Sequence, residues 1–64
     1  MDFNSWMVQV DDIFVVKTGL GRDDWADNRY YDLWEADYTP LEAVTDTVEN
    51  EYGDEGLEAF GLGE

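Results

Sequence analysis

The sequence contains no cysteine and no histidine, and only three basic residues against 17 acidic ones. The absence of cysteine excludes disulfide bonds and thiolate metal sites. The absence of histidine removes the commonest general base and the commonest transition-metal ligand. No apolar run approaches the ~20 residues that span a bilayer, and the first residues lack the basic segment of a signal peptide. We therefore expect a soluble cytoplasmic protein without metal or cofactor.

The 64 residues form one domain at most, and a domain of this size buries only ~60% of its unfolded surface. Three Trp, four Tyr and three Phe can still supply a core, which distinguishes the chain from a disordered acidic tail. The formal net charge is −14. A charge of this size excludes nucleic acid and anionic membranes as direct partners, and it favours a basic surface on another protein.

The clearest structural signal is a helix that begins at Thr39. A capping-box pattern is formed by Thr39 and by Glu42 three residues later, and Pro40 occupies the first helical position. Gly53 is placed to end the helix in the left-handed conformation. Apolar residues recur at helical spacing on one face: Leu41, Val44, Val48 and Tyr52. Acidic residues recur on roughly the opposite face: Glu42, Asp46 and Glu49.

A second helix is predicted over residues 2–18, with Asp2 or Asn4 as its cap and Gly19 at its end. Its apolar residues have helical spacing: Phe3, Trp6, Met7, Val10, Ile13 and Phe14. A hairpin that turns at residues 11–12 is the alternative, but it breaks strand alternation twice and its turn lacks glycine. Val8 and Val15 lie off the main apolar stripe, and we expect them to pack within the chain rather than to form an exposed contact.

A short third helix is predicted over residues 29–36, capped by Asn28, with Tyr30, Leu33 and Trp34 on one face. The fold class is then all-α, a small bundle of about three short helices with an acidic C-terminal tail. Residues 1–53 form the helical mini-domain, and residues 54–64 form a glycine-rich tail that is either docked as a helical turn or disordered. The predicted core contains Trp6, Val10, Phe14, Trp25, Leu33, Trp34, Leu41, Val44 and Val48.

Four short motifs follow one another along residues 3–43: F-x-x-W-M-x-x-V-D, T-G-L, Y-x-x-x-W-E and T-P-x-E-A. In this order they resemble a group of very short helical proteins from bacteriophages and mobile elements. The resemblance implies a phage-like origin and an anti-defence role such as CRISPR–Cas inhibition, and it supplies no catalytic residue. The chain departs from the group at Asp37-Tyr38, where a glycine-containing turn is usual, and in its greater acidity.

Catalysis is not expected, because the chain has no histidine, cysteine, phosphate-binding loop or nucleophile motif and is too short to form much of a cleft. Calcium or magnesium binding is not expected either. The carboxylates of Asp23, Asp24, Asp27 and Asp32 lack the spacing of an EF-hand loop, so helix capping and solvation explain them better.

The acidic faces predict function instead. A small rigid body that carries many carboxylates can occupy a nucleic-acid-binding groove and block it, so we expect a DNA mimic that binds a basic host protein. The predicted partner-binding residues are Glu42, Asp46 and Glu49, with Asp11, Asp12, Asp23, Asp24, Asp27, Glu35 and Asp37 in support.

Two other interpretations stay open. One is a helical adaptor or homodimer that uses apolar residues as its contact: Val8, Val15, Tyr31, Leu57 and Phe60. The other is a halophile-type domain, in which acidity adapts the surface to salt without any mimicry. Salt dependence separates the interpretations, because contacts between charges weaken in salt and apolar contacts do not.

Overall fold

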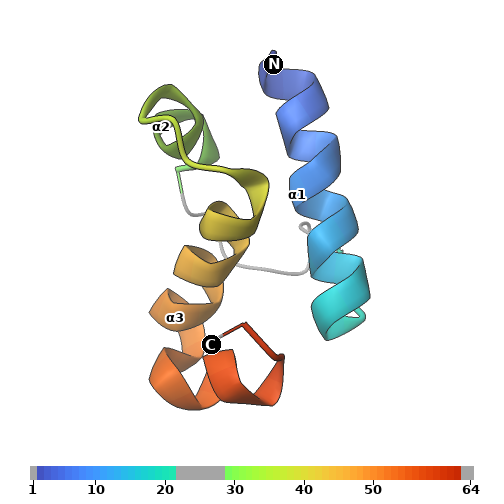
Figure 1. The fold of residues 1–64 in the computed structure, drawn as a ribbon, viewed down its shortest axis with the longest axis vertical. Helices are drawn as coiled ribbons and strands as arrows, with labels where there is room; N and C mark the ends of the chain where they lie inside the picture. Colours follow the sequence, from blue (N-terminus) through green and yellow to red (C-terminus); the bar gives the residue numbers. More distant parts are fainter. Residues whose placement is uncertain (1, 22–28, 63–64) are drawn as a thin grey trace.

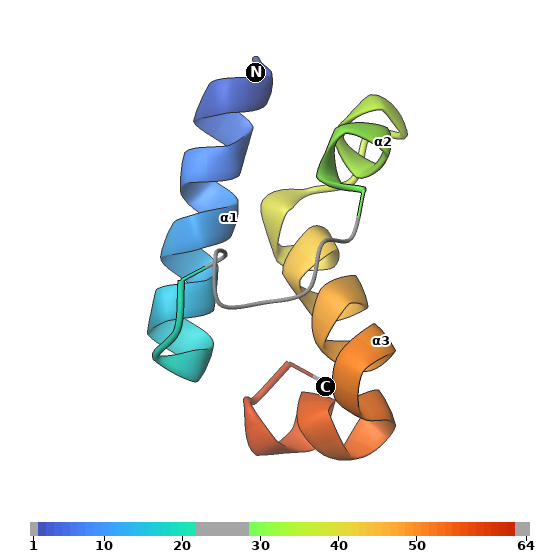
Figure 2. The same cartoon turned by 180° about the vertical axis from the view of Figure 1, so that it is seen from behind.

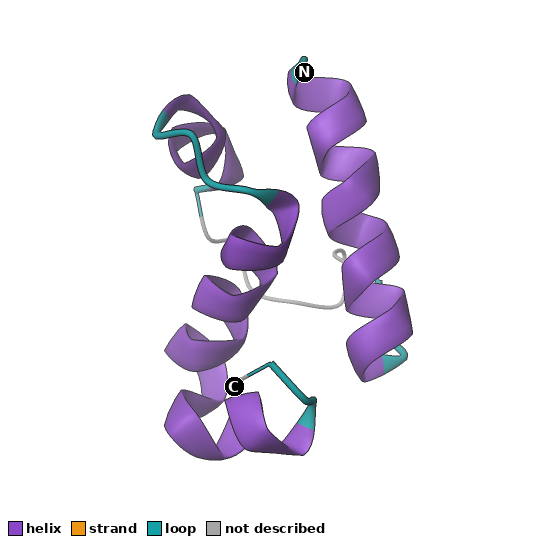
Figure 3. Cartoon of the chain, viewed as in Figure 1, coloured by secondary structure: helices purple, strands orange, loops and turns teal. Residues whose placement is uncertain are grey.

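The structure is a computed structural model that describes residues 2–21 and 29–62. Within these residues the chain forms three helices and no strand: α1 (Phe3–Thr18), α2 (Tyr30–Glu35) and α3 (Pro40–Ala59) (Figures 1 and 3). The all-α prediction is thereby confirmed, and the hairpin alternative is excluded. Several predicted positions lie outside the described residues: Asp23, Asp24, Trp25, Asp27 and Asn28.

Helix α1 begins and ends where the sequence predicts. The Asp2 carboxylate accepts a hydrogen bond from the Ser5 backbone N–H at 3.0 Å, and the C-cap Gly19 adopts the left-handed conformation at φ 79°. Hydrogen bonds from Ser5, through its side chain and its backbone, lower the pKa of Asp2 below its ordinary value. The cap therefore favours the ionised carboxylate, and its contribution to stability is present above the ordinary pKa of Asp and is lost as the pH falls through the lowered one.

Helix α2 ends in a Schellman motif that contains no glycine. The N–H of Asp37 donates to the carbonyl of Trp34 at 3.1 Å, and the N–H of Tyr38 donates to the carbonyl of Leu33 at 3.0 Å. Asp37 takes the left-handed φ of 65° that glycine usually occupies in this motif. Asp tolerates this conformation better than most residues, which explains how the motif forms without glycine.

Helix α1 packs against both other helices. Figures 1 and 2 show α1 beside the first part of α3, with α2 at the end of the molecule where α1 begins. The indole Nε1–H of Trp6 donates to the carbonyl of Tyr38 at 2.8 Å, and this bond ties α1 to the link between α2 and α3. The rings of Phe3, Tyr31 and Trp34 also meet between α1 and α2, at centroid distances of 5.2 to 5.6 Å. Edge-on and tilted ring pairs of this kind stabilise a contact beyond the area that they bury.

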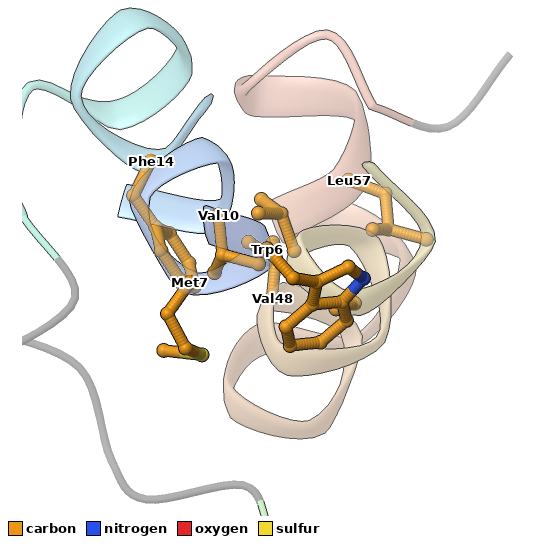
Figure 4. Close-up of a cluster of buried hydrophobic side chains, with 8 residues drawn as sticks. Trp6, Met7, Val10, Phe14, Val48 and Leu57 are labelled. Atoms are coloured by element: carbon orange, nitrogen blue, oxygen red, sulfur yellow. The ribbon is translucent and has the colours of Figure 1, made fainter. Parts of the chain in front are cut away.

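The core lies along the contact between α1 and α3 (Figure 4). Its apolar members are buried: Trp6, Met7, Val10, Phe14, Ala43, Val44, Val48 and Leu57. The partly buried Leu33 and Trp34 pack against this cluster, and so lie at the margin rather than at the predicted centre.

The predicted inner face of α3 is wrong at two positions. Leu41 is 49% exposed and Tyr52 is 58% exposed, whereas Ala43 and Thr47 are buried. The buried side of α3 is therefore rotated toward its small residues. Small side chains allow a neighbouring helix to approach closely, and the Thr47 hydroxyl donates to the Ala43 carbonyl at 2.9 Å, so its burial leaves no donor unsatisfied.

The regular helix that begins at Pro40 is interrupted at Gly53, as predicted, but a second helical segment follows within α3. Gly53 has φ 70° and ψ −158°, a backbone region essentially restricted to glycine, and the helix changes direction there and continues to Ala59. The segment after the bend (residues 54–59, red in Figures 1 and 2) brings Leu57 into the core. Gly61, at φ 71°, then ends it in a second Schellman motif, in which the Leu62 N–H donates to the Leu57 carbonyl at 2.7 Å.

Two valines of α1 do not pack within the chain as we expected. Val8 is 61% exposed and Val15 is 50% exposed. At 100° per residue both point away from the buried side of α1, which is centred on Val10 and Phe14. No described element covers the side of α1 that carries Val8 and Val15, because α2 and α3 both lie against the side that carries Val10 and Phe14.

Candidate protein-binding surface

Three carboxylates follow one another along the outer side of α3. Glu42 and Glu49 are exposed and Asp46 is half-buried. They lie opposite the centre of the buried side, which is formed by Ala43, Val44, Thr47 and Val48. At 1.5 Å per residue they rise along the helix by ~6 Å and then ~4.5 Å. The structure therefore brings these three predicted residues together in one row.

Two of these carboxylates already have partners within α3. The Oε1 atom of Glu42 accepts from the Thr39 backbone N–H at 2.9 Å, and the Thr39 hydroxyl accepts from the Glu42 N–H at 3.1 Å, which completes the predicted capping box. Asp46 accepts from the Asn50 side-chain amide at 3.4 Å. Glu42 thus stabilises the helix as well as contributing charge, so its replacement is a poor test of binding alone.

A shallow depression of about 270 Å³ lies beside the row. Its lining combines the three carboxylates with an aromatic ring, an aliphatic side chain and a hydroxyl: Tyr38, Leu41, Glu42, Thr45, Asp46 and Glu49. The sequence did not reveal Tyr38 and Thr45 as surface residues of this site, and Leu41 was expected in the core. The sequence carries no signal for the half-exposure of Leu41, because that exposure depends on the rotation of the buried side of α3 toward Ala43.

A second depression, also of about 270 Å³, lies between α1 and α3. It is lined by Asp12, Ile13, Val16, Lys17 and Leu41. Val16 is 80% exposed, more than any other large apolar residue of the described chain. Leu41 lines both depressions, so the two are neighbours across the contact between the helices.

The other predicted acidic residues are dispersed. Asp12 is exposed in the second depression, and Asp11 is half-buried with its Oδ1 near the backbone of Gly21. Glu35 and Asp37 are exposed at the end of α2. Asp23, Asp24 and Asp27 lie outside the described residues. Among the described residues, the part of the predicted site that the structure brings together is therefore the row on α3, with Asp12 beyond Leu41.

A third depression, of about 410 Å³, lies at the bend of α3 and is lined by Tyr52, Glu55, Gly56, Ala59 and Phe60. The Tyr52 and Phe60 rings stand 6.2 Å apart across it.

Residues 2–21 and 29–62 contain no cluster of three or more acidic residues placed to hold a metal ion. None of the helices described is long and apolar enough to cross a membrane.

No family model matches the chain, and no curated protein or solved structure matches it either.

Proposed function

We propose that the protein binds a basic, nucleic-acid-binding surface on another protein and thereby keeps DNA or RNA from that surface. The observation that carries this proposal is the density of negative charge on a small body. The molecule measures 31 × 20 × 20 Å and carries a net charge of −14. The 31 Å axis divided by 14 charges gives about one net charge per 2.2 Å, and duplex DNA carries one per ~1.7 Å.

The row on α3 alone is sparser than DNA. The first and last carboxylates of the row are about 10.5 Å apart along the helix axis, so neighbouring charges are about 5 Å apart. The proposal therefore requires the whole body, in which the row is the part with a fixed geometry. A row held on a capped helix with a buried inner side loses little freedom on binding, and such preorganisation favours affinity.

The predicted partner is a protein whose lysines and arginines contact phosphates. CRISPR–Cas complexes, restriction enzymes, repair proteins and RNA polymerase present such surfaces. The resemblance of residues 3–43 to short phage proteins supports an anti-defence target among them, with CRISPR–Cas complexes as the leading class.

The experiment is a pull-down of proteins from a bacterial lysate on the tagged chain, followed by elution with a short DNA duplex at constant ionic strength. We expect a nucleic-acid-binding protein to be released by the duplex. The Asp46→Asn/Glu49→Gln variant leaves the capping box intact, and it should capture less of that protein.

The matched control is Glu55→Gln/Glu58→Gln, which removes the same charge from the exposed surface beyond the bend at Gly53. Equal loss in both variants would mean that total charge matters and the row does not. A partner that stays bound in excess duplex would contradict competition for a nucleic-acid surface.

An apolar adaptor is the second candidate function, and the exposure of Val8, Val15 and Tyr31 favours it. The exposed Asp12 lies between Val8 and Val15 on this side of α1, but no row of three carboxylates like that of α3 accompanies them. A partner held by them should stay bound when salt is raised and should be lost in Val8→Ser/Val15→Ser, whereas a partner of the acidic row should respond in the opposite way.

A further inference from the structure

The two depressions that meet at Leu41 form one surface, here called the Leu41 surface, which comprises Val16, Tyr38, Leu41, Glu42, Asp46 and Glu49. We infer that this surface binds a basic amphipathic segment of the target protein, in which lysine or arginine side chains alternate with apolar ones. The inference rests on the proposed function and adds the kind of contact that the target must offer.

The floor of the Leu41 surface is apolar. Its rim carries the three carboxylates of the row and Asp12, together with one basic residue, Lys17. The apolar side chains of this floor are exposed: 80% for Val16, 49% for Leu41 and 38% for Tyr38. The carboxylates of the row border the same depression as Tyr38 and Leu41. A purely electrostatic copy of DNA would need the carboxylates and not the exposed aliphatic floor.

Lysine and arginine fit both parts of this surface. Their methylene stems pack along apolar side chains while the charged ends stay at a polar edge. A stem laid on Leu41 would place its cationic end within reach of the row, and the ring of Tyr38 offers a face for a cation. An apolar residue of the same segment would fill the neighbouring depression at Val16.

Other occupants fit less well. A second copy of this chain would bring two acidic rims together and double a net charge of −14. Nucleic acid would be repelled for the same reason. An uncharged apolar segment would cover Leu41 but leave the row without a partner.

The test uses two fluorescent peptides with equal numbers of lysines, one with leucines at helical spacing and one with serines in their place. Binding is measured by fluorescence anisotropy over a range of salt concentrations. We expect the lysine–leucine peptide to bind about tenfold more tightly than the lysine–serine peptide, because a central apolar contact adds to the charge contact. Leu41→Ser should remove most of this difference at every salt concentration.

Val16→Ser should act in the same direction as Leu41→Ser. The matched control is Val8→Ser, because Val8 is a comparably exposed valine on another side of the same helix and should have no effect. Asp46→Asn/Glu49→Gln should weaken binding of both peptides and reduce the dependence on salt. Circular dichroism checks that each variant is folded.

The outcomes separate the two proposals. If the charge variant weakens binding while Leu41→Ser and Val16→Ser do not, the inference is overturned and the proposed function stands. If neither class of variant matters, both are overturned. If sedimentation shows a dimer of the unmodified chain that Leu41→Ser dissociates, the surface belongs to a second copy and the inference is overturned.

Discussion

The inner and outer sides of α3 differ in almost every respect. The inner side carries Ala43, Val44, Thr47 and Val48, which are small or β-branched, uncharged and at most 1% exposed. The outer side carries the row of Glu42, Asp46 and Glu49. One helix therefore keeps all charge off the contact with α1 and gathers carboxylates on the face that a partner can reach. Stability and binding therefore depend largely on different residues, with the exception of Glu42, which belongs to the row and also to the capping box.

The largest effect should come from the inner side of the helix pair. Phe14 of α1 is fully buried, and Phe14→Ala should cost about 3–5 kcal/mol in the free energy of unfolding, through lost burial and the cavity left behind. Its neighbour Val15 is 50% exposed, and Val15→Ala should change the same quantity by less than about 0.5 kcal/mol. Urea unfolding followed by circular dichroism measures both. Similar costs would mean that α1 does not present Phe14 to the core.

The next effect concerns the segment that folds back after Gly53. A Cβ atom at Gly56 would overlap Cβ of Tyr52 and lie 3.2 Å from Cγ1 of Val48. Gly56→Ala should therefore destabilise by about 1–3 kcal/mol, although alanine is the better helix former by about 1 kcal/mol. The exposed neighbour provides the control in Glu55→Ala. An increase in stability in Gly56→Ala would show that the segment does not pack against Val48.

A smaller effect is expected at the first turn of α3. Thr39→Ala removes the hydroxyl that accepts from the Glu42 N–H, and it should lower the free energy of unfolding by about 1 kcal/mol. Thr39→Ser keeps the hydroxyl and should be nearly neutral. Thermal unfolding of the two variants gives the comparison. Equal midpoints for both would indicate that the capping box contributes nothing.

The smallest effect per site should come from the outer carboxylates. Screening relieves repulsion among like charges, so the thermal midpoint should rise between ~10 mM and ~500 mM salt, and the rise should be smaller in Asp46→Asn/Glu49→Gln. A flat profile would mean that the charges are well compensated. Folding only at molar salt would instead favour the halophile-type interpretation.

Much of the backbone could be predicted because its signals are local. The capping box of Thr39 and Glu42, the cap at Asp2 and the left-handed Gly19 each depend on residues within one turn. Helical spacing in residues 3–18 was likewise enough to identify α1 and four of its buried residues. Such signals need no knowledge of what the helix packs against.

The features of the fold that the sequence did not predict correctly depend on contacts between residues that are distant in the chain. Leu41 was assigned to the core because it is large and apolar, but small residues such as Ala43 and Thr47 determine where α1 can approach. Gly53 interrupts the helix as predicted, but the helical segment that follows it depends on the burial of Leu57 in the core. Gly61 followed by Leu62 was a local signal for the end of the returning segment, and it was overlooked.

The acidic row could be predicted from spacing alone, and its apolar neighbours could not. Glu42, Asp46 and Glu49 share a face of any regular helix. Tyr38 and Leu41 join that face only because the inner side of α3 is rotated and because the turn at Asp37 places Tyr38 beside it. The composition of the Leu41 surface therefore depends on the tertiary structure.

The central claim is tested most directly by competition for nucleic acid. The dissociation constant of the captured target protein for a DNA duplex is measured at fixed ionic strength, with increasing amounts of this chain. The account predicts an apparent constant that rises linearly with the concentration of chain added, and a smaller rise with Asp46→Asn/Glu49→Gln. A constant that does not change while chain, target and duplex form a ternary complex would contradict it.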